Sequence, residues 1–198
     1  MHPKNNDVHL FCFGGFNIVA NNKSLSIGSH KAKALFLYLA IESPQSLSRS
    51  HLAGLLWCDF SQDKARRNLR QTLFRLQNDA SLAIGDIPLL ISMREQIMIN
   101  PQINLWVDVL AFEDMLSHAY KYFNNHKRLE RLNIQQLIAA IGLFTNAFLD
   151  RFYIKDSNLF NEWASLVRER TSRKAIEAST LLCHYYQRRG DYVKAGQL

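Results

Sequence analysis

Two neighbouring amphipathic segments, residues 48–57 and 65–76, constrain the fold of this chain more than any other part of it. The first begins with Ser48, a residue type that favours the N-cap of a helix, and continues with leucines up to Trp57. On a helical wheel of about 100° per residue, four apolar residues of the second segment fall on one side. These are Ala65, Leu69, Leu73 and Leu76. The pattern predicts a helix, a tight turn and a second helix that buries one stripe.

The opposite side of the second helix is basic. Its outward positions are Arg67, Arg70, Gln71 and Phe74, flanked by Lys64, Arg66 and Arg75. No acidic residue stands between Lys64 and Gln77, so the ion pairs that usually accompany a solvated charged helix are missing. The DNA major groove admits one helix, and an arginine can donate two hydrogen bonds to a guanine. We therefore predict a recognition helix over about residues 61–79 that binds double-stranded DNA.

The basic residues divide into two expected roles, because base contacts carry sequence information and phosphate contacts set the register. Base reading is expected of Arg67, Arg70 and Gln71, with Phe74 as an apolar contact. Phosphate binding is expected of Lys64, Arg66, Arg75 and Arg94. Two alternatives stay open: a basic face can simply be solvated, and Phe74 can pack on a neighbouring element.

The sequence around these helices predicts an α+β winged helix with an N-terminal antiparallel sheet. Expected strands cover residues 8–13, 16–19 and 24–27, followed by a buried helix over 31–41 and a bridging strand at Leu47. Residues 88–92 and 96–100 predict a β-hairpin, which would serve as the wing over 88–100. Arg94 stands at its tip between Met93 and Glu95. We assign residues 1–101 to this domain.

After Pro101 the expected elements are all helical, over residues 107–123, 133–145 and 159–189, with Asp108 as an N-cap and no strand. Residues 181–195 place leucine and tyrosine at helical spacing before Gly190, Asp191 and a small alanine, which is typical of a tetratricopeptide repeat. Such repeats need stacked neighbours. We therefore expect residues 102–198 to be an all-α, tetratricopeptide-like domain that continues in a longer natural protein.

Composition narrows the function further. A net charge of +7 and a pI near 9.5 suit a polyanionic partner. The three cysteines, Cys12, Cys58 and Cys183, lie too far apart for a zinc motif or a disulfide framework, which fits a reducing cytoplasm. The longest apolar run, residues 34–41, is far shorter than the roughly 20 residues that cross a bilayer. We expect a cytoplasmic protein with no membrane partner and no cofactor or metal.

Two other classes of function compete with DNA binding. An enzyme is not expected, because no histidine metal motif, G-x-S-x-G or phosphate-binding loop is present, and Cys58 beside Asp59 is better interpreted as a half-buried structural thiol than as a nucleophile. The other is a protein-interaction adaptor that uses the helical repeats and the winged helix. Salt separates it from DNA binding, which weakens steeply as ionic strength rises.

Taken together, these features resemble the bacterial transcriptional activator family of the SARP or AfsR-like type, in which an OmpR-type winged helix precedes a helical bacterial transcriptional activator domain. The resemblance rests on residues 31–39, 48–57, 66–76, Asp59, Val107, Asp108, Phe112, Phe148, Leu149, Glu162, Trp163 and Arg168. The chain departs from the family at Cys58, where a proline is usual, and at Phe74 and Gln77, where a small and a basic residue are usual. These last two changes concern the base preference and not the mode of binding.

The resemblance implies a transcriptional activator. In the family, tandem protomers bind direct repeats, so a homodimer on DNA is implied, together with recruitment of RNA polymerase and a place at the bacterial nucleoid. OmpR-type proteins contact the polymerase through the loop that corresponds to residues 58–62. Asp59 and Phe60 are therefore implied as polymerase contacts.

Overall fold

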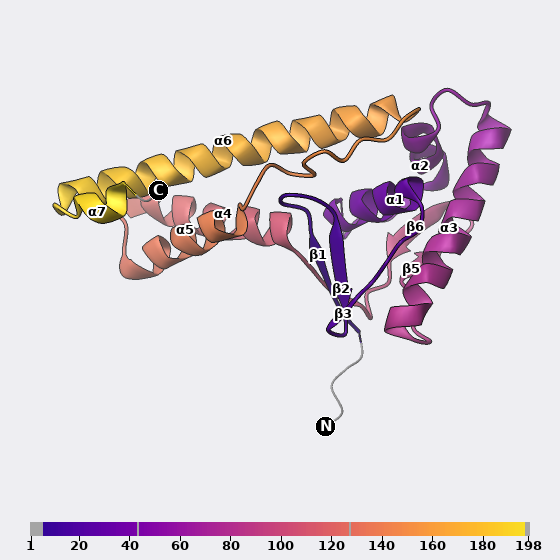
Figure 1. Ribbon diagram of the computed structural model, residues 1–198, viewed down its shortest axis with the longest axis horizontal. Coiled ribbons are helices and arrows are strands. Elements are labelled where there is room, and N and C mark those ends of the chain that lie inside the picture. The colour runs from indigo at the N-terminus through magenta and orange to yellow at the C-terminus, as the bar shows by residue number, and fades with distance from the viewer. Residues whose placement is uncertain (1–5, 43, 127, 197–198) are drawn as a thin grey trace.

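Alternation of apolar and polar residues specifies the N-terminal sheet, with Val8 and Leu10 buried and His9 and Phe11 exposed. The computed structural model (Figure 1) describes residues 6–42, 44–126 and 128–196. In it, β1 (Asp7–Phe11) pairs antiparallel with β2 (Asn17–Ala20), and β2 with β3 (Lys23–Ser24). The third strand is therefore shorter than the predicted 24–27, although Leu25 and Ile27 are buried.

One strand lies where none was predicted. β7 (Asn104–Val107) pairs in parallel with β1, which makes the sheet order β3-β2-β1-β7. The expectation of an all-helical chain after Pro101 was therefore wrong. Only Val107 of this short segment is fully buried, so it has no alternating pattern of its own. Its extended form is specified by the free edge of β1, which belongs to a distant part of the sequence.

The central elements follow the order of a winged helix. They are α1 (His30–Ile41), β4 (Leu47–Ser48), α2 (Arg49–Leu56), α3 (Gln62–Ile84), β5 (Leu90–Ser92) and β6 (Gln96–Ile99), and the second sheet has the order β4-β6-β5. The predicted cap is confirmed, since the Ser48 side chain accepts a hydrogen bond from the backbone N–H of His51. α3 extends beyond the predicted 79 because Ala80 and Ile84 continue its buried stripe, and Gly85 follows with a φ of 83°.

The rest of the chain is helical: α4 (Asp108–His126), α5 (Arg131–Leu143), α6 (Asn158–Arg188) and α7 (Tyr192–Ala195). In Figure 1, α4 and α5 lie side by side, and α6 extends from beside α2 to the end of the molecule farthest from α3. The tetratricopeptide-like character of this part stays a prediction. Within the residues described, no helix combines the length and the apolar character needed to cross a membrane.

Asp108 joins the helical part to the first sheet. It is the first residue of α4, and its Oδ2 accepts hydrogen bonds from the backbone N–H groups of Cys12 and Phe13, at 2.7 and 2.9 Å, while Oδ1 accepts from Val109 N–H at 2.7 Å. Burial raises the pKa of this carboxyl, and the backbone donors partly oppose that rise. Asp108 was predicted as the N-cap but lies inside α4 as its first residue, and its carboxylate instead binds the backbone N–H groups that follow β1.

Lys31 makes a second connection. Its ammonium group donates hydrogen bonds to the carbonyl oxygens of Leu56 and Asp156 and to Ser157 Oγ, and burial lowers its pKa. Ser157 Oγ also donates to Leu56 O at 2.8 Å. These contacts fix the start of α6 against the last turn of α2. The apolar core is likewise continuous across the predicted boundary at residue 101, and that division stays a prediction.

Candidate nucleic-acid interface

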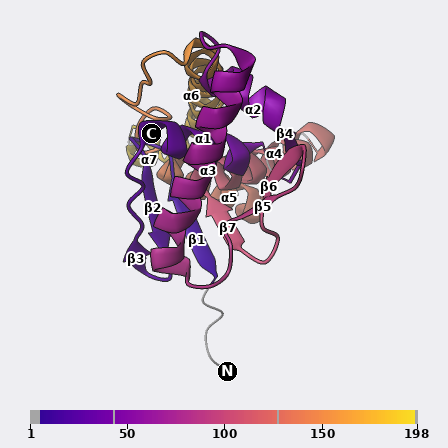
Figure 2. The ribbon, with the colours of Figure 1, turned by 90° about the vertical axis from the view of Figure 1, so that its right-hand side faces the viewer.

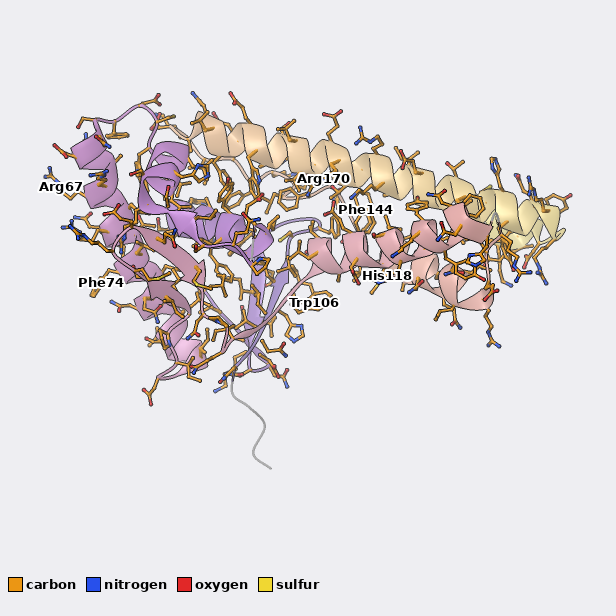
Figure 3. All side chains as sticks on the ribbon, turned by 180° about the vertical axis from the view of Figure 1, so that it is seen from behind. Arg67, Phe74, Trp106, His118, Phe144 and Arg170 are labelled. Carbon is orange, nitrogen blue, oxygen red and sulfur yellow. The ribbon has the colours of Figure 1, made fainter. Side chains whose placement is uncertain are left out.

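The helix α3 buries its leucine stripe and presents its basic side to solvent. Ala65, Leu69, Leu73 and Leu76 are each at most 8% exposed. All the predicted contact residues on α3 are exposed: Lys64, Arg66, Arg67, Arg70, Gln71, Phe74 and Arg75. α3 runs along the uncovered front in Figure 2, and Arg67 and Phe74 point away from the body of the molecule in Figure 3. The predicted division of the helix into a buried and an exposed face is confirmed.

The charge of this face is not neutralised from within the chain. Among the residues that the structure describes, none of the α3 arginines or Lys64 forms an ion pair with a carboxylate. Arginine remains charged at any physiological pH. The face therefore offers uncompensated cations to an anionic partner.

Three of the predicted residues meet in a cleft of about 400 Å³ between α3 and the wing. Arg66 and Arg70 reach it from α3 and Arg94 from the tip of the hairpin, with Leu69 and Glu95 completing the lining together with Arg49. Arg67, Gln71 and Arg75 do not line this cleft and project from α3 beside it. The arrangement gathers arginines from α2, α3 and the wing at a single concave place.

Arg49 is the residue that sequence reasoning missed. Its Nε donates to Met93 O at 3.1 Å, its Nη2 donates to Ser92 Oγ, and its backbone N–H donates to Glu95 O at 2.9 Å. The side chain thus ties the start of α2 to the tip of the wing. A signal was present in the sequence, because a cation directly after the N-cap Ser48 stands at the positive end of a helix dipole, where it is unfavourable without a partner.

The two α3 residues that depart from the family pattern lie beside a second, mostly apolar hollow of about 300 Å³. Phe74 is 67% exposed there, so no neighbouring element buries it. Gln77 is only partly exposed, and its Oε1 accepts a hydrogen bond from Leu90 N–H at 3.2 Å. Phe74 is therefore available to a partner, whereas Gln77 holds β5 against α3.

The turn between α2 and α3 differs from expectation at Cys58, which is exposed and donates through Sγ to Asp59 Oδ1 at 3.6 Å. The prediction of a half-buried thiol was wrong because Trp57 takes the buried position at the end of α2, at 6% exposure, and the chain then turns into solvent. Asp59 is exposed and Phe60 partly buried. Lys64 Nζ lies 4.2 Å from the Phe60 ring centroid, which associates this lysine with the turn and not with the cleft.

No family model and no curated protein sequence matches this chain. Among solved structures, it is similar to Mycobacterium tuberculosis EmbR in complex with a low-affinity phosphopeptide, with a TM-score of 0.65 at 15% identity. The match covers 93% of this chain and 50% of that one, so the chain spans about half the length of the EmbR structure. At this identity the likeness shows a shared fold and assigns no residue roles.

Proposed function

We propose that this chain is the DNA-binding part of a SARP-type transcriptional regulator that recognises specific sequences and activates transcription. The observation that carries the proposal is the exposed, uncompensated arginine face of α3 beside a wing that contributes a further arginine to the same cleft. The fold shared with EmbR supports the resemblance of the sequence to the SARP and AfsR-like family.

In this proposal α3 enters the major groove with the wing against the flanking backbone. Arg67, Arg70 and Gln71 read base edges, and the exposed ring of Phe74 contacts a thymine methyl group. Phosphates are held by Lys64, Arg66, Arg75 and Arg94, to which the structure adds Arg49 as a fifth candidate. Phosphate binding in the cleft is supported by Arg66 of α3 and Arg94 of the wing, which line it together.

The assembly follows from the same resemblance. Tandem protomers would bind direct repeats as a homodimer on DNA, in the bacterial cytoplasm at the nucleoid. Asp59 and Phe60 lie on the turn before α3, with Asp59 exposed and Phe60 partly buried, and they would contact RNA polymerase as the resemblance implies. An intact dimer after removal of residues 107–198 would contradict a role of the helical part in pairing.

The decisive experiment selects bound duplexes from a random DNA pool at low and at near-physiological salt. One repeated motif that survives the higher salt supports sequence-specific regulation. On that motif, Arg67→Ala should lose about 1–3 kcal/mol of binding free energy and relax the base preference. Arg75→Ala should weaken all duplexes alike and lower the salt slope by about one.

The matched control is Arg173→Ala, which removes an exposed arginine on α6 and should leave both quantities unchanged. Equal losses from Arg67→Ala and Arg75→Ala on every sequence would refute the division of roles. The second candidate function, a protein-interaction adaptor, is favoured by the exposed aromatic ring of Phe74 among the arginines. The adaptor function gains support if the chain binds DNA from the pool only weakly, without a motif, and loses that DNA at the higher salt.

A further inference from the structure

A groove lies at the end of the helical part that is farthest from α3, where the last turns of α4 and α6 meet the segment before α5 (Figure 1). Its volume is about 360 Å³. The apolar part of its lining comes from Phe123, Leu129, Leu181 and Tyr185, all of which are only partly buried. The polar part comes from Arg128, His184, Arg188 and Arg189, all of which are exposed. The groove therefore combines an apolar floor with a basic rim.

The rim charge is only partly compensated. Among the residues that the structure describes, no carboxylate lines the groove. Arg128 Nη2 lies 3.3 Å from Glu130 Oε1, in an exposed ion pair that contributes little. Within the described part of the chain, Arg188 and Arg189 have no ion-pair partner, and the Arg189 guanidinium lies 5.5 Å from the centroid of the Tyr185 ring. Two guanidinium groups whose charge no described carboxylate pairs with thus border the apolar floor.

We propose that this groove binds an acidic segment of another protein, one that places a large apolar side chain on the floor and carboxylates against the rim. Charge complementarity selects an acidic partner, because the basic rim repels a basic segment and speeds the association of an acidic one. The apolar floor selects an apolar side chain and not a phosphate backbone, because burying apolar surface against the floor is favourable. Arginine and tyrosine are also enriched among the residues that contribute most of the binding energy at protein interfaces.

The position of the groove leaves the DNA-binding face free. α3 lies at one end of the molecule and the groove at the other, so a duplex and a protein segment can be bound together (Figure 1). The inference does not depend on the proposed function, because it rests on different residues and a different element.

The test is selection of a random twelve-residue peptide library displayed on phage against the full 198-residue chain. We expect enriched peptides that are rich in Asp and Glu and contain one large apolar residue. Arg188→Glu should weaken the binding of a selected synthetic peptide at least tenfold. The matched control is Arg173→Glu, the same charge reversal at an exposed position of the same helix, which should weaken it less than twofold. Replacing the large apolar residue of the peptide by alanine should also lower its affinity for the chain at least tenfold.

Three outcomes would overturn the proposal. One is the absence of any enriched peptide. Another is an equal loss in Arg188→Glu and Arg173→Glu, which would indicate attraction to the overall charge alone. The third is displacement of the bound peptide by a DNA duplex, or by vesicles of anionic phospholipid, to the same extent in Arg173→Glu and in Arg188→Glu. Because the readout is peptide binding, failure here leaves the DNA-binding proposal untouched.

Discussion

Replacing Arg49 tests whether the wing is held in place by the start of α2. The side chain donates two hydrogen bonds to the wing, to Met93 O and Ser92 Oγ, and all three residues are at least partly exposed. An intramolecular hydrogen bond contributes about 0.5–1.5 kcal/mol net. Because these groups reach solvent, we take the lower half of that range for each and expect Arg49→Ala to cost about 1–2 kcal/mol of wing-tip docking. That corresponds to about 5- to 30-fold.

The assay is amide hydrogen exchange at the wing tip, read at Met93, whose N–H donates to Gln96 O at 2.8 Å. Exchange there should accelerate by about 5- to 30-fold in Arg49→Ala, while β6 amides paired with β4 should change little. Arg49→Lys separates the effect of the charge from that of the hydrogen-bonding geometry, because lysine keeps the cation and lacks the planar guanidinium fork. Unchanged exchange at Met93 in both variants would refute the reasoning and leave Arg49 as a simple surface charge.

Three further predictions concern the junction of the two parts. Asp108→Ala leaves three buried backbone N–H groups without a partner and should lower the free energy of unfolding in urea by about 2–5 kcal/mol, against about 0.5 kcal/mol or less for exposed Asp114→Ala; equal losses would contradict this. Since burial raises the pKa of Asp108 above 3.8, the native state binds that proton more tightly than the unfolded chain. The free energy of unfolding, measured relative to Asp108→Asn, should therefore rise as the pH falls through the raised pKa, and a fall would reverse the assignment. Lys31→Met should cost about 1–3 kcal/mol by the loss of three hydrogen bonds, whereas Lys33→Met, whose ammonium lies over the Phe16 ring, should cost less than half of that in the same urea titration.

The helix-turn-helix region could be predicted from the sequence because its signals are local. A leucine stripe from Leu69 to Leu76 and a serine cap depend on residues within one or two turns of each other, so the buried face of α3 and the exposed arginines follow from helical period alone. The hairpin tip at Arg94 was found for the same reason. Nothing more distant than a few residues was needed.

Contacts between remote segments could not be found in this way. β7 is a strand because the edge of β1, almost a hundred residues earlier, offers it hydrogen-bond partners. Cys58 is exposed because Trp57 has the buried place, and Arg49 belongs to the candidate site because the wing folds back against it. Lys31 likewise reaches Ser157 because α6 packs on α2. Periodicity reports which side of an element is apolar, whereas the partner that covers or extends that side depends on how the whole chain closes on itself.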